Sequence, residues 1–123
     1  IILSYDKALA KIIYAGADMF LMPSKSEPCG LAQMIASRYG TVPIVRRTGG
    51  LYDTISPFNV QTGEGNGITF ETYNAHDMLD AIKRALELYN EKAVWHKLVK
   101  NVINTDFSWN ASALKYSELY HKL

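Results

Sequence analysis

The chain has 123 residues, 48% of them hydrophobic, which is enough for one compact domain or part of one. Its formal net charge of +1 provides no strong positive field, so neither nucleic acid nor an anionic membrane is expected as a partner. One cysteine excludes an internal disulfide, and no apolar run approaches the ~20 residues that cross a bilayer. These properties favour a cytoplasmic protein without a membrane segment.

The first predicted elements are a helix and a strand. Apolar residues recur at helical spacing from Tyr5 to Tyr14, with Ser4 or Asp6 as a cap at the start and Gly16 at the end. The segment from Asp18 to Pro23 is apolar and short, which is typical of a buried strand.

A loop rich in turn residues follows this strand. Residues 23–31 contain two prolines and a glycine, residues 31–39 continue as a helix that Gly40 ends, and residues 42–45 form a second strand. This order predicts a parallel, right-handed βαβ unit. Open α/β folds bind ligands at the carboxyl ends of such strands. A helix that opens within Cys29–Leu31 also presents free N–H groups and its dipole to a phosphate.

Glu27 lies in this loop, although a carboxylate repels a phosphate. One explanation is that Glu27 faces hydroxyl groups, so that a ligand with phosphates at one end and a polyol at the other, such as a nucleotide sugar, suits the loop. The alternative is structural, because an acid before a helix stabilises the helix N-terminus. Cys29 is interpreted as a small buried residue rather than a nucleophile, since no histidine is near it in the sequence.

The second strand is followed by a turn with two adjacent glycines. Gly49 and Gly50 would let the main chain approach a ligand closely. Arg46 and Arg47 precede them at the ligand-binding edge, where they would either form a solvated pair or contact an anion.

The rest of the chain predicts a polar surface loop at residues 56–67, a third strand at residues 68–70 and then helices only. Asn74 and Ser108 are the expected caps of the first and last of these helices, whose aromatic residues are interpreted as core packing. Three strands make a thin sheet. The predicted fold class is therefore a partial doubly wound, Rossmann-like α/β domain with a parallel sheet and several C-terminal helices. We expect the missing strands upstream of Ile1, in a longer protein from which this piece is excised.

Two segments closely resemble bacterial glycogen synthases and plant starch synthases. The first reads Pro23-Ser24-x-x-Glu27-Pro28-Cys29-Gly30-Leu31-x-Gln33, and the second reads Arg46-Arg47-Thr48-Gly49-Gly50-Leu51. The resemblance implies that residues 1–123 are part of the C-terminal, nucleotide-sugar-binding domain of a two-domain GT-B glycosyltransferase. Such an enzyme transfers glucose from ADP-glucose or UDP-glucose to the non-reducing end of an α-1,4-glucan with retention of configuration, and requires no metal or other cofactor. Its N-terminal domain is absent from this chain.

The resemblance also implies roles for individual residues. Glu27 is the catalytic acid at the donor glucose. The implied donor-binding residues are Tyr5 on the base, Cys29, Gly30, Leu31 and Ala32 around the sugar and diphosphate, and Arg47, Thr48, Gly49 and Gly50 in the turn that closes on the donor. Related retaining transferases carry a second glutamate where this chain has Ile35, which places the chain in the bacterial and plant branch. The cations that face the diphosphate lie in other parts of such enzymes, so the isolated piece is expected to be inactive.

Two alternatives stay open. One is another GT-B sugar transferase, such as a sucrose-type enzyme, and the other is a non-catalytic nucleotide-sugar-binding module with a regulatory role. A dinucleotide-binding domain is a weaker interpretation, because no Gly-x-Gly-x-x-Gly follows a strand. The sequence favours neither ADP nor UDP.

Overall fold

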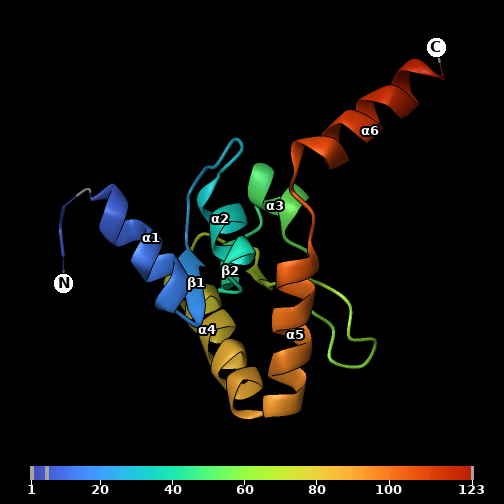
Figure 1. Cartoon of the computed structure of the whole chain (residues 1–123). Coiled ribbons are helices and arrows are strands. Elements are labelled where there is room, and N and C mark those ends of the chain that lie inside the picture. The colour runs from blue at the N-terminus through green and yellow to red at the C-terminus, as the bar shows by residue number, and fades with distance from the viewer. Residues whose placement is uncertain (1, 5, 123) are drawn as a thin grey trace.

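A three-stranded parallel sheet forms the centre of the molecule (Figure 1). The structure, a computed structural model, describes residues 2–4 and 6–122. The strands lie side by side in the order β1 (Met19–Met22), β2 (Val42–Arg46) and β3 (Ile68–Phe70). Leu21 pairs with Ile44, and Ile44 pairs with Ile68, both in parallel register. The predicted α/β class and parallel sheet are confirmed.

Six helices are present in the described residues. They are α1 (Lys7–Gly16), α2 (Ala32–Arg38), α3 (Gly50–Thr54), α4 (Ala75–Asn90), α5 (Lys92–Asn104) and α6 (Trp109–Tyr120). Asp6 caps α1, Asn74 caps α4 and Ser108 caps α6, each by accepting a main-chain N–H of the first turn. All three caps were among the sequence predictions. The side chain of Asp6, rather than that of Ser4, fills the first of these positions.

The short helix α3 stands where the sequence predicted only a turn. The N–H of Ile55 donates to the carbonyl of Leu51 at 3.1 Å, and both side chains are buried against Val45. Five residues are too few for apolar periodicity to reveal a helix. Contact with the sheet therefore stabilises α3, and its own pattern does not predict it.

Alternate residues of β2 pack into two apolar clusters on opposite faces of the sheet. Ile44 belongs to the larger cluster, in which Leu98 and Val102 of α5 are also buried. Val45 belongs to the smaller cluster with Leu51 of α3. Because β2 is covered on both faces, packing holds it firmly in place. The residues at its carboxyl end are therefore also fixed in position.

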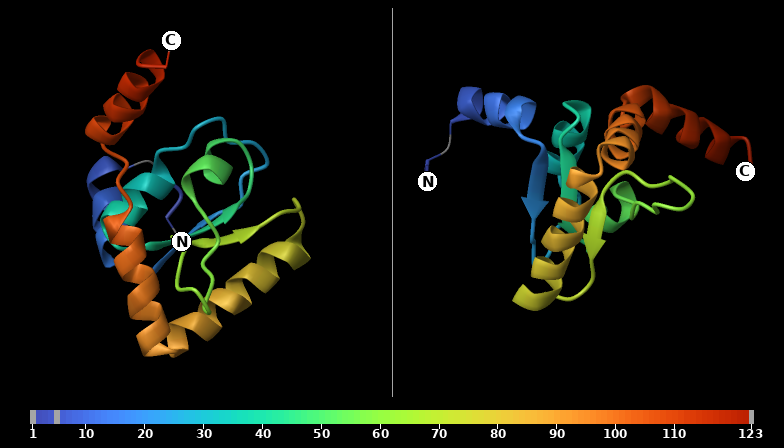
Figure 2. Two further views of the ribbon diagram at one scale, coloured as in Figure 1. Left: turned by 90° about the vertical axis from the view of Figure 1, so that its right-hand side faces the viewer. Right: turned by 90° about the horizontal axis from the view of Figure 1, so that it is seen from below.

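Helices α1 and α6 lie outside this core. Neither contains a buried residue, and α6 points away from the sheet (Figure 1 and Figure 2). Trp109 is 89% exposed, so the interpretation of the late aromatic residues as core packing is wrong for α6. It holds for Trp95 of α5, which is buried against Tyr89. Across residues 2–4 and 6–122, no helix has both the length and the apolar character to span a membrane.

Candidate functional site

Three loops leave the carboxyl ends of the three parallel strands. Residues 23–31, which we call the Glu27 loop, connect β1 to α2; residues 47–49 connect β2 to α3; residues 71–74 connect β3 to α4. Figure 1 shows the Glu27 loop beside α3 at one end of the molecule. Ligands bind at this edge of open parallel sheets. The predicted site residues lie in the first two loops and the helix starts behind them, apart from Tyr5, which is outside the described residues.

The glycine turn packs directly on the Glu27 loop. The N–H of Gly50 donates to the carbonyl of Glu27 at 3.0 Å. A Cβ on Gly49 would lie 2.2 Å from the Glu27 carbonyl oxygen, and one on Gly50 would lie 2.0 Å from the carbonyl oxygen of Cys29. Gly49 also has a φ of +47°, in the region that side chains disfavour. The two glycines were expected to let backbone approach a ligand, and here they let one loop approach the other.

Arg46, the last residue of β2, holds the first half of the Glu27 loop. Its Nε donates to the carbonyl of Ser24 at 2.8 Å and its Nη2 donates to that of Lys25 at 2.6 Å. Its Nη1 donates to the carbonyl of Glu71 in the third loop at 3.2 Å. One guanidinium therefore ties two of the three loops together.

Gln33 holds the second half of the Glu27 loop from the first turn of α2. The side chain is fully buried, and its Nε2 donates to the carbonyls of Cys29 at 3.2 Å and Gly30 at 2.9 Å. The same nitrogen lies 3.2 Å from Oγ1 of Thr54, which in turn donates to the carbonyl of Gly50. Within the described residues, the Oε1 of Gln33 is buried without a hydrogen-bond partner.

Arg47 points to the third loop. Its Nη1 forms an ion pair with Glu71 Oε1 at 2.8 Å, and its guanidinium lies 4.2 Å from the ring centre of Tyr52. The hydrogen bond with Glu71 raises the pKa of Arg47 above its ordinary value. The interpretation of Arg46 and Arg47 as a solvated pair is therefore wrong, since both are half-buried and engaged with neighbouring groups.

The carboxylate of Glu27 remains available to a ligand. The residue is half-buried, yet its side chain forms neither a hydrogen bond nor an ion pair with any described residue. It does not cap α2, because the cap position is Leu31 and no side chain bonds the first turn of that helix. The structural alternative for Glu27, that of a helix-capping acid, is wrong.

Other groups in the same loop are also open. The thiol of Cys29 is exposed, which contradicts its interpretation as a small buried residue. The N–H groups of Cys29, Gly30 and Leu31 donate to no acceptor in the part of the chain that the structure describes. Leu31 is exposed, Ala32 begins α2, and Thr48 accepts the N–H of Leu51 at 3.1 Å. The loop is thus fixed through its carbonyls and side-chain anchors while several of its donors are free.

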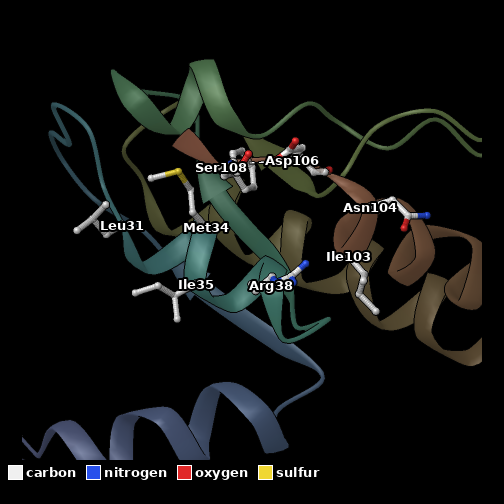
Figure 3. Close-up of a pocket in the computed structure, with 10 residues that line it drawn as sticks. Leu31, Met34, Ile35, Arg38, Ile103, Asn104, Asp106 and Ser108 are labelled. Atoms are coloured by element: carbon white, nitrogen blue, oxygen red, sulfur yellow. Dashed lines mark hydrogen bonds between the residues drawn. The ribbon is translucent and has the colours of Figure 1, made fainter. Parts of the chain in front are cut away.

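A separate cavity of about 830 Å³ lies between α2 and the connection from α5 to α6 (Figure 3). Its lining includes Leu31, which directly precedes α2, Ile35 of α2, and Phe107 of the connection. Arg38 and Asp106 carry its charges, and hydrogen bonds from Ser108 hold the pKa of Asp106 below its ordinary value. Glu27 does not line this cavity, and the sequence did not predict it. In the described residues no three His, Cys, Asp or Glu side chains are grouped as metal ligands.

Sequence reasoning missed Gln33, Thr54 and the anchoring role of Arg46. Gln33 stands in the first motif, two positions after Leu31, and an amide on the apolar side of a predicted helix is a signal for a buried hydrogen-bond anchor. Arg46 gave no such signal, because its partners lie 21, 22 and 25 residues away along the chain.

Known proteins match this chain along nearly its whole length. The family described as glycosyl transferases group 1 matches residues 2–102. A glycogen synthase of Desulfitobacterium hafniense is 57% identical over 124 residues, which are 100% of this chain and 27% of that protein. A glycogen synthase of Bacillus cereus is 55% identical over 121 residues, which are 98% of this chain and 25% of that protein. The chain thus spans about a quarter of the length of these relatives.

Solved structures agree. The catalytic domain of starch synthase IV from Arabidopsis thaliana, bound to ADP and acarbose, has a TM-score of 0.86 at 45% identity, covering 98% of this chain and 25% of that one. A sucrose-phosphate synthase from Thermosynechococcus elongatus has a TM-score of 0.68 at 26% identity, covering 98% and 29%. These similarities confirm the expected GT-B-type fold and the resemblance to glycogen and starch synthases. By its sequence and its fold, the chain belongs to the family of glycosyl transferases group 1.

Proposed function

We propose that residues 1–123 are the donor-binding part of the C-terminal domain of a retaining glucosyltransferase of the glycogen and starch synthase type. The complete protein transfers glucose from ADP-glucose or UDP-glucose to the non-reducing end of an α-1,4-glucan, together with an N-terminal domain. Support comes from the 57% identity to a bacterial glycogen synthase and from the 45% identity to a starch synthase, against 26% to a sucrose-phosphate synthase. The expected cytoplasmic location is part of the same proposal.

One observation carries the proposal: the Glu27 loop is rigidly anchored, yet its carboxylate and its N–H groups are free. Fixed N–H groups on Cys29, Gly30 and Leu31 suit phosphate oxygens. The free carboxylate of Glu27 suits hydroxyl groups or developing positive charge. A nucleotide sugar offers both kinds of partner, and a simple phosphate ester of an apolar molecule does not.

The roles in the reaction follow from where charge develops. As the bond between glucose and phosphate breaks, negative charge grows on the leaving diphosphate and positive charge grows on the sugar ring. Glu27 stabilises the sugar side, the N–H groups of residues 29–32 hold the diphosphate side, and the turn formed by Arg47, Thr48, Gly49 and Gly50 closes on the donor. Tyr5 stacks on the base. Further cations come from the rest of the protein, so the isolated chain has no measurable transferase activity.

Incubation of the full-length protein with each labelled nucleotide sugar and glycogen tests the proposal. We expect label in the polymer with at least one donor and none with the isolated chain. Binding of a nucleotide sugar without transfer would support the regulatory module instead. Transfer to a sugar phosphate rather than to glycogen would support a sucrose-type enzyme.

A further inference from the structure

We propose that Arg46 is a positioning residue of this transferase, whose guanidinium sets the geometry of the loop that carries Glu27. The inference rests on the proposed function for its chemical outcome and on hydrogen bonds of the described residues for its mechanism. Arg46 was expected either to be solvated or to bind an anion. Instead, three N–H groups of its guanidinium donate to main-chain carbonyls of the two loops.

The Glu27 loop is anchored from two sides, and Arg46 supplies one of them alone. The second half of the loop is held by Gln33 and by the N–H of Gly50. In the first half, the only hydrogen bonds between the described residues and the segment from Ser24 to Ser26 come from Arg46. These bonds hold the chain just before Glu27, whereas the bond from Gly50 holds Glu27 itself. Removing Arg46 therefore leaves the segment just before Glu27 without an anchor, while the rest of the loop stays attached.

The chemistry requires an arginine. A guanidinium offers five N–H donors in a rigid planar fork, so it can serve carbonyls that lie in different directions at once. The acceptors are the carbonyls of Ser24, Lys25 and Glu71, which come from two different loops. A lysine carries one ammonium on a flexible stem and cannot span the same three positions. Arg46 is the last residue of β2, a strand that is covered on both faces, so the main chain that carries this guanidinium is held in place by the core.

The third acceptor links donor-site geometry to the loop after β3. Glu71 gives its carbonyl to Arg46 and its carboxylate to Arg47. Asp77 accepts the N–H groups of Glu71 and Thr72 and so fixes this segment against α4. Through Arg46, the position of the loop after β3 therefore affects the position of the Glu27 loop. It acts through Glu27 and is not placed in contact with the donor.

Steady-state kinetics of Arg46 variants in the full-length protein test this inference. We expect Arg46→Met and Arg46→Lys each to lower kcat by about 10²-fold, the effect of a misplacement of about 1 Å at a reacting group, with a smaller change in the donor KM. The matched control is Arg84→Met. Arg84 Nη2 also donates to a main-chain carbonyl, that of Thr69 in β3 at 2.8 Å, but does not touch the Glu27 loop. Its kcat should stay within about twofold of the wild type.

A double-mutant cycle separates positioning from a general loss of stability. If Arg46 acts through Glu27, Arg46→Met should lower kcat much less in a Glu27→Gln background than in the wild type. The inference would be overturned if Arg46→Met lowered kcat by the same factor in both backgrounds, or if Arg46→Lys kept the turnover of the wild type. It would also be overturned if both Arg46 variants unfolded while Arg84→Met stayed folded. Absence of glucose transfer by the wild-type protein would overturn the proposed function and the inference with it, which distinguishes the two failures.

Discussion

Two loops of this molecule are anchored in the same way, by side chains that donate to main-chain carbonyls, but they differ in how many of their own polar groups stay without a partner. In the Glu27 loop, Arg46 and Gln33 donate to main-chain carbonyls. In residues 56–67, which we call the Asn66 loop, Asn101 donates to the carbonyls of Gly63 at 2.8 Å and Gly65 at 2.9 Å. Planar side-chain donors therefore help to hold both loops, in addition to main-chain hydrogen bonds such as that from the N–H of Phe58 to the carbonyl of Gly67 at 2.8 Å.

The difference lies in what the anchoring leaves free. Asn66 uses both ends of its amide: its Oδ1 accepts the N–H of Ser56 at 2.7 Å, and its Nδ2 donates to Thr54 and Thr105. The Glu27 loop keeps a half-buried carboxylate, and none of its N–H groups, those of Cys29, Gly30 and Leu31 included, has an acceptor among the described residues. In the Asn66 loop most N–H groups have acceptors, and the carboxylate of Glu64, which has no partner among the described residues, is exposed. A rigid loop whose donors are unsatisfied is preorganised for a ligand, whereas a rigid loop whose donors are mostly satisfied mainly connects elements.

The largest effect in this comparison should come from adding one methyl group against the Glu27 loop, at Gly49, and one within the Asn66 loop, at Gly65. Gly49→Ala places a Cβ 2.2 Å from the carbonyl oxygen of Glu27, and Gly65→Ala places one 2.2 Å from that of Pro57; both glycines have positive φ. Both variants should lower the thermal midpoint. Only Gly49→Ala should also lower kcat of the full-length protein, by about 10²-fold, because it displaces Glu27. Similar kcat values for the two variants would erase the distinction between the loops.

An intermediate effect should come from removing one amide anchor from each loop. Gln33→Met and Asn66→Leu each leave partly buried carbonyl or hydroxyl groups without donors, at a cost of about 1 kcal/mol in the free energy of unfolding. We expect kcat to fall only for Gln33→Met. Denaturant unfolding and steady-state assays of the same preparations would check this, and a loss of kcat in Asn66→Leu would contradict it.

The smallest effect concerns the loop after β3. Hydrogen bonds from Thr72 hold the pKa of Asp77 below its ordinary value, so this carboxylate contributes stability that is present above about pH 4 and is lost as the pH falls through its folded-state pKa. Asp77→Asn should lower the thermal midpoint near pH 7, with the gap to the wild type closing in acid. Turnover should stay within about twofold of the wild type. A gap that is constant from pH 7 to pH 3 would exclude this role for Asp77.

Sequence reasoning succeeded where the signal is local. The caps at Asp6, Asn74 and Ser108 were predictable because a cap depends on its neighbours in the chain. The placement of Glu27 and the glycine turn at one edge was predictable because parallel strands end together. Both follow from a few residues and the strand order.

It failed where the deciding contact is distant. Arg46 bonds residues 21 to 25 positions away, and Gly49 fits against Glu27, which is equally remote. Helix α3 is too short to have a detectable period. The spacing of the apolar residues of α6 does not reveal the exposure of Trp109, because periodicity predicts a face of a helix and not the partner of that face.

The most direct test of the account is the turnover of Glu27→Ala in the full-length protein, with Glu64→Ala of the Asn66 loop as the control. Both are loop glutamates, but only Glu27 lies where the structure leaves a half-buried carboxylate free. We predict that Glu27→Ala lowers kcat by about 10²-fold or more with a smaller change in the donor KM, and that Glu64→Ala has wild-type kinetics. A change confined to the donor KM, or equal kinetics for the two variants, would contradict the claim that Glu27 acts on the reacting sugar.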